Sequence, residues 1–167
     1  MIIDVHAHPL LFDVINENPE DLNFRKQEFG VFKSGINPVD FEMTLLADAQ
    51  IDKVVLLPED YSAESGRPIV SNDEMAKIVD KSPEHFIGFA SVDPRKAEAK
   101  EELLRAFDEL GLMGLKLNPA KQRFYPDDRM MWPIYEKCLE YGRPILFHAG
   151  LSWEPQTLCK YSHPLRF

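Results

Sequence analysis

The chain has 167 residues, of which 44% are hydrophobic and 28% are charged, so it suits one domain over residues 1–167 and excludes wholesale disorder. Nineteen basic against 28 acidic residues give a net charge of −9, which argues against a nucleic-acid binder and against attachment to anionic lipid. No apolar run approaches the ~20 residues that span a bilayer. The first residues lack the basic flank of a signal peptide, and two cysteines form no disulfide framework, so we expect a cytoplasmic protein.

Short apolar runs bounded by turn residues predict strands that are buried on both faces. They are Ile2–Val5, Lys53–Leu57, Phe86–Val92, Leu112–Leu117 and Pro144–His148. Apolar residues at helical spacing predict helices over Asp40–Gln50, Asp73–Lys81, Glu98–Leu110 and Met130–Tyr141. Ser71 and Asn72 are natural N-caps, and Gly111 and Gly142 end helices. Alternating strands and helices require a mostly parallel sheet with right-handed crossovers, so the fold class is α/β.

Two long connections, residues 9–38 and 151–167, follow the carboxyl ends of strands, where α/β proteins build their sites. The first contains four aromatic residues, Phe12, Phe24, Phe29 and Phe32. These rings either cap a pocket or anchor a long loop to the body of the domain. In the second connection Trp153 and Glu154 either line the pocket or pack the tail.

The first strand ends in His6-Ala7-His8, and side chains at positions i and i+2 of a strand point to the same side. The two imidazoles are therefore expected to converge as two ligands of one metal ion. Zinc and other divalent first-row ions accept neutral imidazole nitrogen readily. The alternative is a pair of core histidines, which would need two buried hydrogen-bond networks side by side.

His148 is the last residue of the fifth predicted strand and is expected at the same rim, as a third metal ligand. Asp4 shares a face with the first two histidines and could orient an imidazole by accepting a hydrogen bond. His85 precedes a strand and is expected at the surface of the opposite rim. His163 lies in the tail and is interpreted as a loop residue.

Lys116 is the candidate catalytic residue. On its strand Met113, Leu115 and Leu117 form an apolar face that should pack on helices, and Lys116 belongs to the opposite face with Gly114. A lysine close to such histidines is a substrate anchor, a base with a tuned pKa, or a carbamylated bridging ligand. The alternative is a lysine that extends its ammonium to solvent.

Several segments resemble the metal-dependent amidohydrolase superfamily. The opening Ile3-Asp4-Val5-His6-Ala7-His8 resembles the start of that superfamily. Residues 114–119 (GLKLNP), 124–128 (FYPDD), 133–135 (PIY) and 142–150 (GRPILFHAG) resemble its amidohydrolase-2 branch, which includes aminocarboxymuconate-semialdehyde decarboxylase and related aromatic-acid decarboxylases. The resemblance runs through essentially the whole chain.

The resemblance implies a TIM-barrel (β/α)8 fold with a divalent metal at the carboxyl-terminal rim. It implies His6, His8 and His148 as ligands, and zinc as the metal, with manganese and iron as alternatives. The branch usually adds a later histidine as acid/base and a later aspartate as ligand and base, which have no counterpart here. A closed barrel needs eight strands and ~250 residues, so only the N-terminal five β/α units are expected.

Two rival interpretations fit the residues less well. A flavodoxin-like open sheet fits the length, but Pro9-Leu10-Leu11 is not the Gly-rich turn of a phosphate site, and histidines stand where a receiver domain has paired acids. A deoxyribonuclease of the TatD group also begins with His-x-His. It usually presents a glutamate at the fourth strand, where this chain has Lys116.

The expected function is a metal-dependent hydrolase of this superfamily that acts on a small carboxylated or cyclic substrate. The alternatives are a non-oxidative decarboxylase of the same branch and a truncated metal-binding module without catalysis. The expected partner is a small-molecule substrate, with no nucleic acid and no membrane. A sheet of five barrel strands exposes two edges, so the expected outcome is a homo-oligomer that closes the sheet, a rearranged open sheet, or poor solubility.

Overall fold

The computed structural model describes residues 1–154 and 157–167, and it contains parallel strands in two hydrogen-bonded groups. The first group is β1 (Ile3–Ala7), β2 (Lys53–Leu56) and β3 (Phe86–Gly88), and the second is β4 (Leu115–Leu117) and β5 (Ile145–Phe147). A parallel bridge between Ala90 and Leu115 joins the groups. The strands therefore follow one another in chain order, as the α/β prediction requires.

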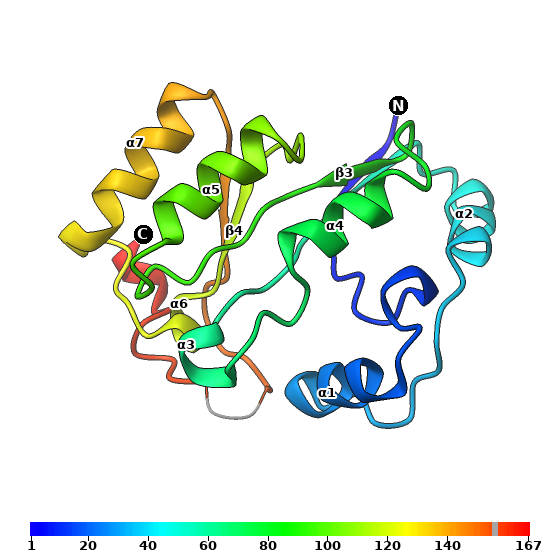
Figure 1. Cartoon of the computed structure of the whole chain (residues 1–167), viewed down its shortest axis with the longest axis horizontal. Helices are drawn as coiled ribbons and strands as arrows, with labels where there is room; N and C mark the ends of the chain where they lie inside the picture. Colours follow the sequence, from blue (N-terminus) through cyan, green and yellow to red (C-terminus); the bar gives the residue numbers. More distant parts are fainter. Residues whose placement is uncertain (155–156) are drawn as a thin grey trace.

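Helices connect the strands. They are α1 (Pro19–Phe29), α2 (Val39–Asp48), α3 (Ser62–Ser65), α4 (Asn72–Val79), α5 (Ala99–Asp108), α6 (Pro119–Gln122) and α7 (Trp132–Glu140), with 3-10 turns at Asp13–Ile15, Arg129–Met131 and Pro164–Arg166. In Figure 1, α5 and α7 lie side by side. The short helices α3 and α6 lie with α1 toward the end where β1 and β4 finish. These elements therefore surround the carboxyl-terminal rim.

The alternation along β2 and β3 separates two apolar faces. Val54 and Leu56 belong to the larger core, which also includes residues of α4 and α5. Val55 and Leu57 belong to a second cluster with Phe89, whose members lie on the opposite face. Since successive strand residues face opposite ways, the sheet has a helix-covered outer face and a separate inner face.

Gly114 allows the inner face to pack closely. A Cβ atom at this position would lie 2.5 Å from the ring of Phe89, so any larger residue would collide with the ring. Leu146 of β5 joins the same inner cluster. The inner face therefore has an apolar floor beneath the polar residues that follow the strands.

Some boundaries differ from the predictions. The third and fourth strands are shorter than predicted, and Met113 is 46% exposed instead of packed on a helix, because β4 begins only at Leu115. The predicted burial on both faces is observed for β2 and β4. Strand β1 is mostly exposed, because β2 is its one partner among the described strands.

Helix α1 lies inside the connection predicted as a long loop. Its ends carry recognisable signals: the Asn18 side chain accepts a hydrogen bond from Glu20 N, Pro19 follows the cap, and Gly30 has φ +67°. The helix lacks a regular apolar stripe, which explains why periodicity missed it. No helix within residues 1–154 and 157–167 is long and apolar enough to cross a membrane.

Candidate functional site

His6 and His8 meet at the carboxyl end of β1. Their Nε2 atoms are 3.3 Å apart, as the His-x-His spacing predicts. His8 Nδ1 lies 2.9 Å from the carbonyl oxygen of Leu57. Because a carbonyl only accepts, Nδ1 carries the proton, and in the neutral ring Nε2 keeps a free lone pair directed at His6.

A β-bulge shapes this strand end. Asp4 pairs with Val54 and Ala7 pairs with Leu56, so β1 has one extra residue between these pairs. The Asp4 carboxylate accepts a hydrogen bond from the backbone N–H of His6, at 2.9 Å. The prediction that Asp4 orients an imidazole was therefore wrong: it stabilises the bulged backbone instead.

Burial lowers the pKa of both rings. For His8 the negative charge of Glu59 opposes this shift. The nearby ammonium of Lys116 lowers the pKa of both histidines further. The neutral imidazole, which is the form that ligates metals, is thereby favoured in both residues.

His148 follows β5 and faces the same interior. The positive charge of its protonated form contributes to lowering the pKa of His6, and its own pKa is lowered by burial and by Lys116. Its Nε2 is buried and has no hydrogen-bond partner among the residues that the structure describes. Among the described residues no three His, Cys, Asp or Glu side chains lie close enough together to hold a metal ion, so the three-histidine ligand set remains a prediction.

Lys116 is almost fully buried, with 1% exposure, on the inner face of β4. Burial lowers its pKa, and the carboxylates of Glu59 and Glu154 oppose this shift. Its charge acts on all three histidines, so the side chain points to the interior as the period-two pattern predicts and does not extend into solvent. Its ammonium forms no ion pair within the described part of the chain.

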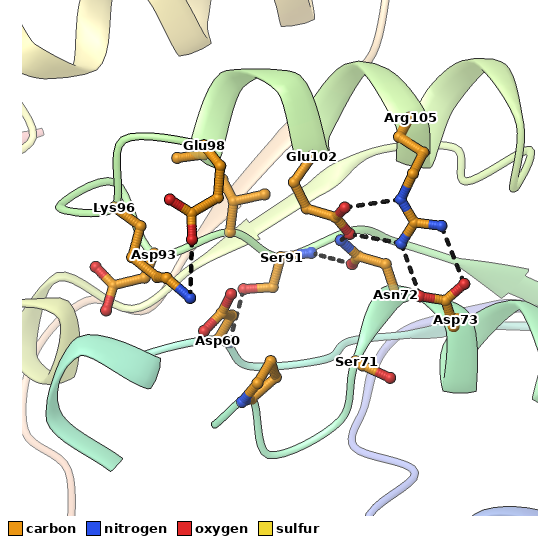
Figure 2. Close-up of a pocket in the computed structure, with 13 residues that line it drawn as sticks. Asp60, Ser71, Asn72, Asp73, Ser91, Asp93, Lys96, Glu98, Glu102 and Arg105 are labelled. Carbon is orange, nitrogen blue, oxygen red and sulfur yellow. Dashed lines mark hydrogen bonds and ion pairs between the residues drawn. The ribbon is translucent and has the colours of Figure 1, made fainter. Parts of the chain in front are cut away.

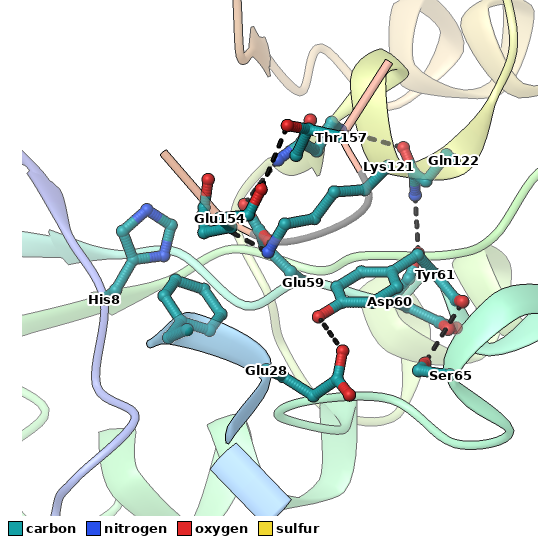
Figure 3. Close-up of polar contacts among 12 residues, drawn as sticks. His8, Glu28, Glu59, Asp60, Tyr61, Ser65, Lys121, Gln122, Glu154 and Thr157 are labelled. Atoms are coloured by element: carbon teal, nitrogen blue, oxygen red, sulfur yellow. Dashed lines mark hydrogen bonds and ion pairs between the residues drawn. The ribbon is translucent and has the colours of Figure 1, made fainter. Parts of the chain in front are cut away.

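A buried ion cluster lies beside His8 (Figure 3). Lys121 Nζ is 3.0 Å from a Glu59 carboxylate oxygen and 3.2 Å from a Glu154 oxygen, and all three side chains are at most 8% exposed. Asn118 donates a second hydrogen bond to Glu59 at 3.0 Å. Burial raises the pKa of Glu59, but the positive charges of Lys121 and His8 and the hydrogen bonds from Asn118 and Lys121 together outweigh burial and lower the pKa.

The end of α1 closes this side of the rim. The Lys121 ammonium lies 4.2 Å from the ring centre of Phe29 and 4.6 Å from that of Tyr61. The Trp153 indole N–H donates to the Phe29 carbonyl at 3.1 Å, and the Phe29 and His8 ring centres are 5.6 Å apart. Phe29 therefore borders the site, as one interpretation of the aromatic residues in this connection predicts.

Some of the other predicted residues belong to the site, and others lie at the surface. Glu154 belongs to the ion cluster, and Phe32 is 67% exposed. His85 is partly exposed and bonds Ser82, and His163 is exposed and accepts the hydrogen bond that caps a 3-10 turn. Sequence reasoning missed Glu59 and Lys121. Their positions just after β2 and β4 were the available signal.

A second polar pocket lies between α4 and α5 (Figure 2). Asn72 and Ser91 are linked by a hydrogen bond, and Arg105 binds both Asp73 and Glu102. These polar groups pair with one another. These bonds form a structural network that joins the two helices. The pocket that the network lines is separate from the histidines.

The model of the amidohydrolase family matches residues 3–166, which is nearly the whole chain. The chain belongs to the amidohydrolase family. The match confirms the resemblance to the amidohydrolase-2 branch that residues 114–119, 124–128, 133–135 and 142–150 carry.

Two curated relatives support this branch. A 2-amino-3-carboxymuconate-6-semialdehyde decarboxylase of Dictyostelium discoideum is 33% identical over 84 residues, which are 50% of this chain and 23% of that protein. A 2-keto-4-carboxy-3-hexenedioate hydratase of Sphingobium sp. is 26% identical over an alignment that covers 93% of this chain and 54% of the hydratase. The chain thus spans at most about half the length of these relatives.

A solved structure supports the fold. An uncharacterised TIM-barrel protein of Bordetella bronchiseptica superposes with a TM-score of 0.65 at 22% identity, over 99% of this chain and 60% of that one. The chain therefore has the TIM-barrel fold in part, as five parallel strands in barrel order. The flavodoxin-like interpretation is thereby excluded.

Proposed function

We propose that His6, His8 and His148 form part of a divalent-metal site in an enzyme that acts on a small carboxylated or cyclic compound. The observation that carries the proposal is the His6–His8 pair, with Nε2 atoms 3.3 Å apart and His8 held in one tautomer by Leu57. His148 adds a buried Nε2 that has no hydrogen-bond partner within residues 1–154 and 157–167. Imidazole is a suitable ligand for zinc, manganese and iron.

Zinc is the first candidate metal, with manganese and iron as alternatives. A dihydroxybenzoic acid decarboxylase of Polaromonas sp., which shares the fold at 24% identity and a TM-score of 0.61, holds manganese. A metal ion bound here would polarise a carbonyl or carboxylate, or lower the pKa of a bound water toward ~7. Hydrolysis is the first candidate reaction, and the decarboxylase relative favours decarboxylation as the second.

Lys116 is proposed as the residue that binds the negative charge of the substrate. Its ammonium is buried beside the histidines, whereas the ammonium of Lys121 already has two carboxylate partners. A buried ammonium is stable only when a counter-charge lies close to it. A carboxylate group of the substrate would supply that charge while the rest of the molecule faces the metal ligands.

Metal titration tests the proposal. The purified chain, stripped of metal, is titrated with Zn²⁺ and with Mn²⁺ by calorimetry, and one strong site is expected. His6→Ala, His8→Ala and His148→Ala should each weaken binding by at least about tenfold, since each removes a ligand. His163→Ala is the matched control and should bind as the unmodified chain does, because this exposed histidine lies in the tail.

Circular dichroism shows whether each variant is folded. Absence of binding by the unmodified chain, or equal affinities in folded histidine variants and the control, would contradict the metal site. A loss in the first two variants alone would limit the site to the pair at the end of β1.

A further inference from the structure

Both ends of the sheet are open. Among the described residues, β1 has β2 as its one partner strand and β5 has β4. Every pairing that joins the strands is parallel, so β1 and β5 run in the same direction. The helices that accompany these two strands, α2 and α7, lie at opposite ends of the molecule (Figure 1). Each end therefore offers a strand edge with which a further strand could pair.

The β1 end is apolar and acidic. Val5 of β1 is 58% exposed, and Phe41 and Leu45, one turn apart on α2, are exposed as well. Strand β1 and helix α2 contain no lysine or arginine, and their acidic residues are Asp4, Asp40, Glu42 and Asp48. A partner that fits this end must therefore combine apolar surface with positive charge.

A groove along the outer side of β5 supplies apolar surface at the other end. Its volume is about 340 Å³. The two charged residues that line it, Asp127 and Arg166, pair with each other at 3.5 Å. The remaining lining residues are apolar or aromatic: Pro126, Tyr135, Ile145, Phe147 and Phe167. On the adjoining helix α7, Leu139 is 83% exposed. This end therefore has apolar surface that a partner could cover.

The β5 end is also basic, although the net charge of the chain is −9. Residues 143–167 contain three basic residues, Arg143, Lys160 and Arg166. Their one acidic residue, Glu154, already belongs to the buried ion cluster. Among the described residues, Arg143 and Lys160 form no ion pair. The two ends therefore match in strand direction, apolar character and charge, so each end fits the opposite end of a second copy.

We propose that two copies of the chain associate head to tail, with the β1 end of each against the β5 end of the other. A two-fold axis parallel to the strands gives this arrangement, because it places β5 of one copy beside β1 of its partner with both strands parallel. Two identical seams then close a barrel of ten parallel strands, which is wider than a barrel of eight. Pairing of like ends is disfavoured, because it would bring like charges together. This association does not require a metal ion at the histidines.

Sedimentation equilibrium of the 167-residue chain measures the association. A dimer of twice the chain mass of 19.3 kDa is expected. Val5→Lys places a charge on the β1 edge and should raise the dimer dissociation constant at least about tenfold, since edge lysines block strand pairing. Phe32→Lys is the matched control and should leave the constant unchanged, because Phe32 is also an exposed apolar residue but lies in the loop after α1.

Charge reversal tests which ends meet. Arg143→Glu with Lys160→Glu makes the β5 end acidic, and Asp40→Lys with Asp48→Lys makes the β1 end basic. Each double variant alone should dimerise at least about tenfold more weakly, because both of its seams bring like charges together. An equimolar mixture of the two double variants should dimerise again, because each seam then joins opposite charges.

Circular dichroism checks that every variant is folded. A chain that stays monomeric, or a dimer that folded Val5→Lys does not weaken, would overturn the proposal. Double variants that fail to recover on mixing would do the same, since like ends or another surface would then form the contact. Assemblies that grow beyond a dimer with concentration would contradict the closed arrangement and indicate an open head-to-tail chain.

Discussion

Removal of the cation from the buried Glu59–Lys121–Glu154 cluster should strongly destabilise the protein. Lys121→Met keeps the length of the side chain and removes its charge, which leaves two carboxylates without their partner. At 3.0 Å and 3.2 Å, and with an effective dielectric constant of about 20, each ion pair gains about 5 kcal/mol before desolvation is counted. Desolvation offsets most of this gain, and breaking such a buried pair typically costs about 3–5 kcal/mol.

The loss should depend on pH in a defined direction. Because Lys121 lowers the pKa of Glu59 in the folded protein, its stabilisation is present above the unfolded-state pKa and is lost as pH falls through the folded-state pKa. In the variant, burial without the cation raises the pKa of Glu59, so the folded variant takes up a proton more readily than its unfolded chain does. The difference between the two proteins in free energy of unfolding should therefore shrink from pH 7 to about pH 4.

Urea denaturation followed by circular dichroism measures the free energy of unfolding at both pH values. Thermal melting should show a fall of about 6–20 °C at pH 7 for a chain of this size. Lys137→Met is the control, because its pair with Glu140 is largely exposed and should contribute less than about 1 kcal/mol. A loss below about 1 kcal/mol, or one that does not change with pH, would refute the account of the cluster.

Three further substitutions follow from the packing and from helix capping. Gly114→Ala should cost about 1–3 kcal/mol in urea denaturation because its Cβ collides with Phe89, whereas Gly35→Ala, whose Cβ meets nothing, should stay within about 0.5 kcal/mol. Lys116→Met should raise the melting temperature, because it removes a buried ammonium that has no ion-pair partner among the described residues; an unchanged or lower melting temperature would contradict that description. Ser71→Ala removes the capping box of α4 and should cost about 1 kcal/mol, whereas Ser71→Gly should cost a few tenths; equal losses would argue against the cap.

The order of strands and helices could be predicted because it depends on local patterns. Apolar runs of four to seven residues between turn residues marked every strand, and helical spacing marked α2, α4, α5 and α7. The ends were less accurate, because they depend on which backbone groups find partners in neighbouring strands. The exposure of Met113 is one such case.

The histidine pair was predictable for the same reason. His6 and His8 stand two residues apart at a strand end, and this spacing brought their Nε2 atoms together even though a bulge shifts the register of β1. The bulge itself had no signal in the pattern of apolar residues. In this bulged strand the Asp4 carboxylate accepts a hydrogen bond from the backbone N–H of His6.

The amino-acid sequence by itself therefore determined the parallel α/β class, the inward position of Lys116 and the meeting of His6 with His8, because strand periodicity acts over neighbouring residues. Only the tertiary structure decided that Glu59, Lys121 and Glu154 share one buried cluster and that Phe29 of α1 lies against His8. These contacts join residues that are 21 to 62 positions apart in the chain, and the hydrogen bond from Trp153 to Phe29 spans 124 positions. Such contacts follow from how charges and apolar surface are buried together, which no local pattern encodes.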